Sequence, residues 1–446
     1  MSEPALIWSA AAMLVTAIVL PYLRAFRKRE QADRERKEEA VRLGIDQPTA
    51  QFPYVDQSRC IGCGACVEAC PEGDVLGIVG GVATIVNGLR CIGHSACAEA
   101  CPVSGIEVGL GDLRSREDIP LLDEWNETNL KGLFIAGELG GLALIRNAVA
   151  QGRRVGARIG EQARWLGPSA PDVLDVLVVG AGPAGLTAAL TAQEQGLRCA
   201  VLEQESDLGG TVLHYPRRKL VLVQPVELPY DVRLRRDEYT KEDLLELLQE
   251  LLGRTRLDVR FGARATGVLR DEGVFRVSSS QGELRARFVV LALGRRGTPR
   301  KLGVPGEELS KVTYKLIDAE SYERQRLLVV GGGDSAVEAA IGLARQGTNR
   351  VTLSYRREKL VRMKKKNEER LEELLRTGAV SLAMPTSVLE IRPESVRLRG
   401  TAGEVEIPND HVLVCAGGEP PFAFLREIGV RFGGAPGSAP KAVSAQ

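Results

Sequence analysis

The sequence predicts an α/β protein of several domains, and two repeated kinds of motif indicate this class. Apolar runs followed by closely spaced glycines and an alanine-rich segment occur at residues 174–203 and 327–347. This strand–turn–helix pattern is typical of sheets covered by helices. Seven cysteines gather between Cys60 and Cys101, which indicates a small separate domain built around metal. A chain of 446 residues suffices for two to four domains.

The bulk composition excludes some function classes. Hydrophobic content of 44% and charged content of 26% are ordinary for a globular protein. A net charge of +1 and an aromatic content of 4% argue against a nucleic-acid partner. The clustered cysteines favour iron–sulfur ligation over disulfides, and therefore a reducing, cytoplasmic compartment for the body of the protein.

The N-terminus carries an uncharged segment from Ala5 to Leu23, which as a helix would be about 28 Å long, close to the apolar thickness of a bilayer. Trp8 and Tyr22 lie near its ends, and four basic residues follow within residues 24–29. The positive-inside rule then predicts a single-pass anchor over residues 1–23 in the inner (cytoplasmic) membrane, with the bulk of the protein in the cytoplasm. The alternatives are a buried helix or a cleaved signal peptide, which normally has its basic residues first. Residues 24–50 mix both charge signs at helical spacing and predict a solvated helical linker.

Two cysteine motifs carry the strongest chemical signal. Residues 60–71 read CIGCGACVEACP, and residues 91–102 read CIGHSACAEACP. In the pattern C-x2-C-x2-C-x3-C-P, three cysteines surround one cluster and the fourth binds the other. The first [4Fe–4S] cluster is predicted on Cys60, Cys63, Cys66 and Cys101. The second is predicted on Cys70, Cys91 and Cys97. Over residues 54–110 the chain resembles the bacterial two-cluster ferredoxins, and a ferredoxin-like α+β domain is expected over residues 51–110.

The second motif departs from that family at His94, which stands in a cysteine position. Three interpretations stay open: His94 is a ligand through an imidazole nitrogen, the site holds a three-iron cluster, or His94 lies beside a cluster with water on one iron. A neutral imidazole in place of a thiolate would raise the reduction potential.

The first glycine motif, G-x-G-x-x-G, follows the apolar run Val176–Val179. Its glycines make the turn, allow a pyrophosphate to approach and let helix pack on strand. A second strand over 199–202 ends in an acid placed to accept hydrogen bonds from a ribose. The predicted nucleotide-binding residues of this segment are Gly180, Gly182, Pro183, Ala184, Gly185 and Glu203.

The second motif, G-x-G-x-x-A, is followed by a strand over 351–353 that ends in Ser-Tyr-Arg-Arg instead of an acid. Arginines there would pair with a 2′-phosphate, which favours NADPH over NADH. The alternative is that they are ordinary solvated charges, as is expected for the run 362–366. The predicted residues are Gly331, Gly333, Asp334, Ser335, Ala336, Arg356 and Arg357.

Residues 174–430 resemble the thioredoxin reductase-like flavoproteins with two dinucleotide-binding domains. The matching stretches are GAGPAGL, EQESDLGG, VVLALGRRGTPRKLGVPG, GGGDSAVEAA with SYRR, and VLVCAGGEPPFAFLREIGV. The resemblance implies two Rossmann-like domains: an FAD domain over 171–310, an inserted NADPH domain over 311–400, and a return to the FAD domain over 401–432. Gly210 and Gly294 are expected among the FAD-binding residues.

Two departures from that family bear on function. The CxxC of thioredoxin reductases is absent from VTYKLIDAESYERQR, and Ala184 stands where bacillithiol-type relatives have a cysteine. Cys199 and Cys415 are expected to be structural. Electrons would therefore leave the flavin by another route, which the fused clusters supply.

The family's closing segment occurs before the first glycine motif instead of after the last strand. Residues 129–160 contain GLFIAGELGG, in which Gly137 and Glu138 replace the usual Gly-Asp. We interpret residues 111–170 as a circularly permuted closing segment whose helix, from about Leu142, directs its positive N-terminus at the flavin. This would bring the ferredoxin module close to the flavin. The alternative is a strand and helix that link two domains. The tail 433–446 is expected to be disordered.

The resulting hypothesis is hydride transfer from NADPH to FAD, followed by single-electron steps through the clusters to a redox partner protein or small acceptor. The reverse direction uses the same parts, and a homodimer is compatible with the sequence. A second hypothesis is reduction of a small or disulfide substrate at the flavin. A third is a non-catalytic redox sensor or a subunit that docks to a membrane complex. His214 is placed to approach the flavin pocket or to pack, and His411 is expected to be structural.

Overall fold

The structure is a computed structural model that describes residues 3–45, 51–110, 116–142, 144–223, 225–271, 273–361 and 363–433. The predicted disordered tail therefore lies, apart from Gly433, outside the described residues. The chain divides into two compact units, an N-terminal unit of residues 1–111 and a C-terminal unit of residues 112–446.

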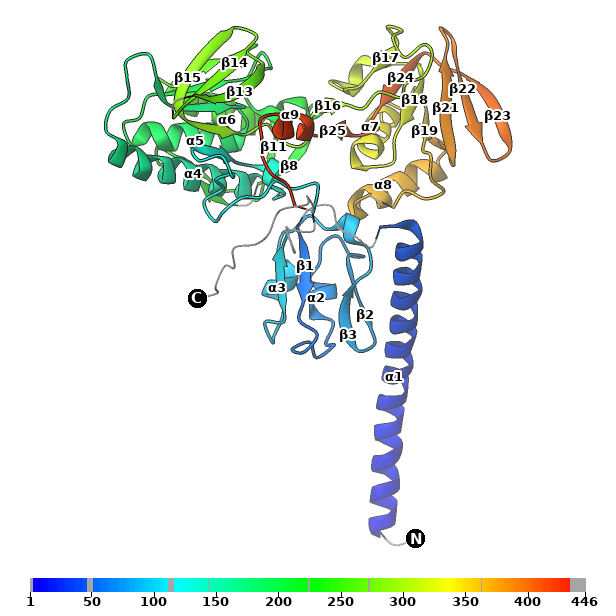
Figure 1. Cartoon of the computed structure of the whole chain (residues 1–446). Coiled ribbons are helices and arrows are strands. Elements are labelled where there is room, and N and C mark those ends of the chain that lie inside the picture. The colour runs from blue at the N-terminus through cyan, green and yellow to red at the C-terminus, as the bar shows by residue number, and fades with distance from the viewer. Residues whose placement is uncertain are drawn as a thin grey trace. The chain divides into compact units, whose positions relative to one another are not determined.

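The N-terminal unit is a small α+β fold around a core of cysteines and aliphatic side chains (Figure 1). Its outer strands, β1 (Phe52–Val55) and β4 (Ile106–Gly109), pair antiparallel, and β2 (Leu76–Val79) forms a hairpin with β3 (Val82–Ile85). Two short helices, α2 (Ala65–Glu68) and α3 (Ala96–Glu99), each lie within one of the cysteine motifs. The first and last strands thus close the fold, and the two motifs face each other inside it.

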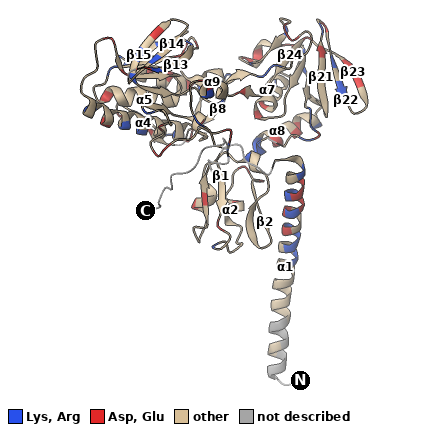
Figure 2. Cartoon of the chain, viewed as in Figure 1, with Lys and Arg blue, Asp and Glu red and all other residues tan. Residues whose placement is uncertain are grey.

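A single helix of 41 residues, α1 (Glu3–Leu43), precedes this core. Apart from Glu3, its charged residues lie in the second half, from Arg24 onward (Figure 2). That half is not a solvated linker: Phe26 packs against the core of the unit, and Asp33 and Ala40 are buried. The charge pattern could not indicate this, because it does not show which side of a helix meets a neighbour.

Within the part of the chain that the structure describes, no helix meets the length and apolarity needed to cross a bilayer. This finding contradicts the predicted anchor over residues 1–23 and the predicted location as a single-pass inner-membrane protein. The uncharged segment does not form a helix of its own, since it continues without a break into the charged half of α1. Its described large apolar side chains, among them Trp8 and Ile18, are exposed.

The C-terminal unit contains two principal sheets. In the first, β6 (Leu174–Val179) and β7 (Cys199–Leu202) run parallel and are joined by α5 (Pro183–Glu194). The strand order is β12 (Asp258–Arg260), β7, β6, β15 (Gly282–Leu291), β14 (Val274–Ser279) and β13 (Ala265–Asp271). An early strand, β5 (Leu133–Ile135), pairs parallel with the end of β15, and α4 (Ile145–Leu166) follows it.

The second sheet is fully parallel, in the order β17 (Val312–Thr313), β24 (His411–Val414), β18 (Arg326–Val330), β19 (Arg350–Ser354) and β20 (Val380–Ala383). Helices α7 (Asp334–Ala344) and α8 (Lys365–Arg376) connect its strands. Because β24 lies between β17 and β18, the chain leaves this sheet only after Val414. The predicted return at residue 401 is therefore too early. The pair β16 (Thr298–Pro299) and β25 (Gly418–Glu419) marks where the chain passes between the two sheets.

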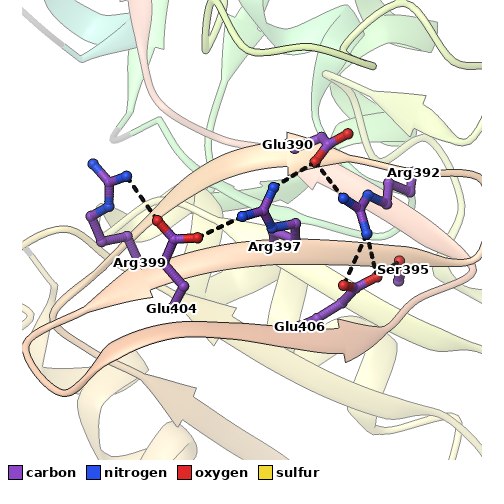
Figure 3. A network of polar contacts seen from close by, with 7 residues as sticks. All are labelled: Glu390, Arg392, Ser395, Arg397, Arg399, Glu404 and Glu406. Carbon is purple, nitrogen blue, oxygen red and sulfur yellow. Dashed lines mark hydrogen bonds and ion pairs between the residues drawn. The ribbon is translucent and has the colours of Figure 1, made fainter.

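A three-stranded antiparallel meander extends from the second sheet, formed by β21 (Thr386–Ile391), β22 (Ser395–Gly400) and β23 (Gly403–Pro408). One face is apolar, with Val396 and Leu398 buried. The other carries alternating ion pairs between arginines and glutamates (Figure 3). Such exposed pairs satisfy one another across strands but add little stability singly.

The smaller elements of the C-terminal unit complete this description. They are β8 (Leu220–Leu222) with β11 (Glu238–Thr240), β9 (Val226–Glu227) with β10 (Arg233–Leu234), and the helices α6 (Lys241–Gly253) and α9 (Phe422–Glu427).

Candidate functional site

The predicted cluster ligands separate into two pockets of the N-terminal unit. One pocket is lined by Cys60, Cys63, Cys66 and Cys101. The other is lined by Cys70, Cys91, His94 and Cys97. Each pocket thus combines ligands from both motifs, as the interleaved spacing predicts. In the described residues, no three His, Cys, Asp or Glu side chains converge on a single metal ion. A cubane differs from such an ion because its ligands bind separate iron atoms.

Backbone N–H groups donate to two sulfur atoms of the first pocket, whereas burial disfavours bare thiolates in both pockets. The Ala83 N–H donates to Cys60 Sγ at 3.3 Å, and the Gly105 N–H donates to Cys101 Sγ at 3.3 Å. Burial, with the neighbouring thiolates adding to it, raises the pKa of Cys66 to about 11, and the pKa of Cys97 rises to about 11 in the same way. Thiolates there need a compensating positive charge, which iron would supply.

His94 adopts an arrangement that distinguishes its two ring nitrogens. Nδ1 accepts a hydrogen bond from the Ala96 N–H at 3.3 Å. Nε2 is buried and has no hydrogen-bond partner among the described residues. Burial lowers the pKa of His94, which favours the neutral ring that can bind a metal. Ligation through Nε2 would place the ring proton on Nδ1, so the contact with Ala96 would have to change.

Gln51 is a site residue that the sequence analysis missed. It is buried, and its Nε2 donates to the carbonyl oxygens of Ile92 and Gly93, at 3.0 Å in both cases. A Cβ on Gly93 would lie 1.7 Å from this amide. The second ligand loop is therefore held by a side chain outside the motif. No local pattern could reveal this, because the contact spans 41 residues.

In both glycine motifs of the C-terminal unit, the first glycine is required by the packing of the chain and the second is not. Gly180 and Gly331 have φ of +110° and +150°, and a Cβ on either would lie within 2.4 Å of a carbonyl oxygen, of Ala292 or Cys415. These two glycines are needed by the fold itself. In contrast, Gly182 and Gly333 have negative φ, and a Cβ would meet only open space or a single atom at 3.8 Å.

The remaining residues of the first motif lie around the start of α5. Pro183 and Ala184 begin the helix, and a Cβ on Gly185 would lie 1.9 Å from the Gly180 oxygen. The buried carboxylate of Glu203 accepts hydrogen bonds from the N–H groups of Ala181 at 2.7 Å and Glu205 at 2.9 Å. Since a carboxylate has about four acceptor positions, Glu203 keeps capacity for a ribose hydroxyl.

Gly210, Gly294 and Gly137 also lie near this turn. A Cβ on Gly210 would be 3.1 Å from the Cα of Gly182, and Gly294 has Thr211 Oγ1 as its nearest neighbour, at 3.7 Å. Gly137 approaches Ala184, and its N–H donates to Gln151 Oε1 at 2.8 Å. The structure therefore brings residues from three separate stretches of the chain to the N-terminus of α5.

Glu138 follows Gly137 in a short 3-10 turn, and its side chain reaches solvent although protein atoms surround much of its carboxylate. Desolvation by the surrounding protein raises its pKa, although Arg295 opposes the shift. Helix α4 begins at Ile145, three residues later than expected. Tyr215, unnoticed in the sequence, lies close enough to Glu138 to be affected by its charge, and burial raises its pKa to about 12.

Helix α4 lies against α5 through a stripe of small residues. Cβ atoms on Gly152 and Gly156 would lie 2.5 Å and 2.7 Å from the carbonyl oxygens of Ala184 and Ala188. Glycines four apart share one helix face, and here they let the two backbones approach closely. The segment before β6 is therefore packed directly on the helix of the first glycine motif.

His214 lies in a polar group between the two sheets of the C-terminal unit. Its Nε2 is 3.0 Å from Glu205 Oε1, and its Nδ1 is 3.2 Å from Lys315 Nζ. Burial and the cationic neighbour lower the pKa of His214. His411 lies on β24 with its ring against Tyr322, at 5.3 Å between centroids.

At the second motif, Asp334 and Ser335 begin α7, and Ala336 is buried against Gly331. The Asp334 carboxylate accepts hydrogen bonds from the Lys364 N–H and from Asn367 Nδ2, each at 2.9 Å. Asp334 thus holds the start of α8. Arg356 and Arg357 follow β19 after Tyr355, and Arg356 is exposed.

The comparisons with known proteins decide the family. Residues 177–436, more than half of the chain, match the model for pyridine nucleotide-disulphide oxidoreductases. The chain belongs to this family. Residues 52–102 of this oxidoreductase match a 4Fe-4S dicluster domain. The protein is thus an FAD-dependent oxidoreductase of the ferredoxin–NADP reductase type, with an iron–sulfur domain.

Several relatives of this oxidoreductase carry the name ferredoxin–NADP reductase. The protein from Ignicoccus hospitalis is 31% identical over 268 residues, which cover 58% of this chain and 82% of the relative. The protein from Thermus thermophilus is 32% identical over 262 residues, covering 56% and 74%. Among solved structures, bacillithiol disulfide reductase Bdr from Bacillus cereus is 26% identical, with a TM-score of 0.53 and coverage of 58% and 82%.

Proposed function

We propose that this oxidoreductase exchanges electrons between NADPH and a one-electron redox partner, using FAD and two iron–sulfur clusters held by the same chain. The observation that supports this most directly is the separation of the seven motif cysteines and His94 into two pockets of four residues each. When bound, FAD would accept a hydride from NADPH and release electrons singly, and the clusters would carry single electrons.

The residues of this chain would bind FAD and fix its position. We propose that Gly182 and the N-terminus of α5 receive the pyrophosphate, that Glu203 accepts from a ribose, and that Glu138 lies at the flavin. The pairing of β5 with β15 and the contact of α4 with α5 support the interpretation of residues 111–170 as a permuted closing segment. In that arrangement the N-terminus of α4 would favour negative charge on the reduced ring.

A dithiol route is disfavoured by the two cysteines of the C-terminal unit. Cys199 lies on β7 of the first sheet, and Cys415 follows β24 of the second. Burial raises the pKa of Cys199 to about 12 and that of Cys415 to about 11, so both remain protonated thiols at neutral pH. This favours electron exit through the iron–sulfur domain over disulfide reduction.

An anaerobic titration of the purified protein with NADPH tests the proposal. Visible absorption should show bleaching of the flavin, EPR should then show reduced clusters, and iron should be counted per chain. If iron is present and NADPH bleaches the flavin without reducing any cluster, the proposed route is excluded.

The arginines after β19 give a prediction on coenzyme choice. The double variant Arg356→Ala/Arg357→Ala should lower kcat/KM for NADPH about tenfold or more, because charge-assisted contacts to the 2′-phosphate would be lost. Activity with NADH should change little. Arg350→Ala, exposed at the other end of the same strand, is the matched control. Equal losses with both coenzymes would contradict the assignment.

The second cluster gives a prediction on potential. His94→Cys should lower the reduction potential of that cluster, because an anionic thiolate would replace a neutral imidazole. The measurement is a mediated redox titration followed by EPR, with the signal of the first cluster as the internal reference. An unchanged potential would mean that His94 does not bind iron.

A further inference from the structure

The second half of α1 holds one edge of the β2–β3 hairpin. Within the described residues β2 pairs only with β3, so the N–H groups on its other edge need partners. Asp33 Oδ2 accepts from the Ile78 N–H at 2.7 Å, and Glu30 Oε1 accepts from the Gly80 N–H at 2.9 Å. Glu30 and Asp33 are three residues apart and therefore lie on one face of the helix. Ile78 and Gly80 are two residues apart, so their N–H groups point to the same side, toward that face.

This contact is close and specific. A Cβ on Gly77 would lie 2.8 Å from Asp33 Cγ, so only glycine leaves room for the carboxylate beside the strand. Asp33 is 6% exposed and also pairs with Arg36. Arg36 in turn forms an ion pair with Asp74. The Oδ2 atom of Asp74 also lies 3.1 Å from Nη1 of Arg90, a buried residue that directly precedes Cys91.

The other side of the hairpin faces the first cluster pocket. Ile78 and Ala83 line this pocket with the four cysteines, and Ala83 supplies the N–H that donates to Cys60 Sγ. The hairpin turn also supports the ligand loop, since a Cβ on Gly62 would lie 2.2 Å from the Gly81 carbonyl oxygen. The hairpin therefore lies between α1 and the loop that carries Cys60 and Cys63.

We propose that Glu30 and Asp33 of α1 are positioning residues for the first iron–sulfur cluster, acting through the β2–β3 hairpin. This rests on the proposed function only in that a cluster occupies the Cys60 pocket. Hydrogen bonds to ligand sulfur stabilise the more negative, reduced cluster, and outer residues of this kind tune metal sites. Loosening the hairpin would weaken the N–H···S contact and expose the pocket to solvent.

The test compares Asp33→Ala with Asp33→Asn, which keeps an acceptor oxygen, and with Glu38→Ala, an exposed acid on the same helix. In Asp33→Ala, backbone hydrogen exchange over residues 76–85 should accelerate, and iron release to a chelator should be at least about tenfold faster, as expected when a charge-assisted hydrogen bond is lost. The potential of the first cluster should be lower in Asp33→Ala than in Asp33→Asn, because both variants remove the negative charge and only Asp33→Ala removes the hydrogen bond to the hairpin. Asp33→Asn should show much smaller changes, and Glu38→Ala should match the parent protein.

Should Asp33→Ala fail to fold, Glu30→Ala removes the acceptor at the hairpin turn alone and should give the same changes with smaller size. Unchanged hydrogen exchange, iron release and potential in a folded variant would overturn the positioning role. All three readouts use dithionite-reduced or resting protein. They therefore report on this role even if NADPH fails to reduce the clusters, an outcome that would exclude only the proposed electron route.

Discussion

Gly182→Val is expected to give a folded protein that retains its iron and lacks FAD. The backbone at Gly182 has φ of −76°, and a Cβ there would find only Gly210 Cα, at 3.8 Å, so the fold accepts a side chain. FAD binding would not tolerate this side chain, because the isopropyl group would occupy the space through which the pyrophosphate approaches the N–H groups at the start of α5. Loss of two charge-assisted hydrogen bonds lowers affinity more than about hundredfold.

Gly333→Val is the matched comparison in the second motif, since a Cβ there also meets open space. It should keep FAD and lose NADPH-dependent flavin reduction, while chemical reduction by dithionite persists. Flavin absorbance, circular dichroism and iron content measure the outcome. If Gly182→Val retains stoichiometric FAD, or if Gly333→Val loses it, the assignment of FAD to the first motif and NADPH to the second is incorrect.

Cys60→Ala is expected to stop NADPH-driven reduction of an external one-electron acceptor while leaving flavin reduction by NADPH intact. Cys60 lines the first pocket and accepts the Ala83 N–H, so its removal takes away one proposed iron ligand and the acceptor of a partly buried hydrogen bond. Iron content should fall by about half, because one of the two proposed clusters would be lost. Stopped-flow reduction of the flavin and steady-state reduction of a one-electron dye separate the two activities.

Cys199→Ala provides the control for Cys60→Ala, because Cys199 is a protonated thiol on a strand of the first sheet. It should keep full iron content and full activity with the dye. Dye reduction that persists in Cys60→Ala at the parental rate would show that electrons leave the flavin directly.

Local spacing predicted much of the site. The seven motif cysteines and His94 line two pockets in the grouping that their intervals predict, and the glycine motifs follow strands and begin helices. These features depend on covalent geometry over a few residues, which the sequence states directly. The predictions of an FAD- and NAD(P)-dependent oxidoreductase family and of an iron–sulfur domain also depended on such local motifs, and both were confirmed.

Contacts over long sequence separation could not be predicted. Gln51 reaches the loop at Gly93, and the glycine stripe of α4 meets α5, through pairings that exist only in the folded chain. The predicted membrane anchor is wrong for a different reason. The prediction considered the uncharged segment alone, whereas in the structure this segment is continuous with a charged helix. The boundary at residue 401 was misplaced because β24 inserts between earlier strands.

The first and last described stretches of the C-terminal unit are joined by hydrogen bonds. Pro120 forms an antiparallel bridge with Phe432, the Leu121 N–H donates to the Arg431 oxygen at 2.8 Å, and Asn129 Nδ2 donates to the Gly429 oxygen at 3.0 Å. A gene rearrangement that moved the proposed closing segment, residues 111–170, from one end of the coding sequence to the other would therefore keep these contacts. Under the permutation proposed above, such a transposition would be a simple evolutionary path for joining an iron–sulfur domain to a flavoprotein at this position.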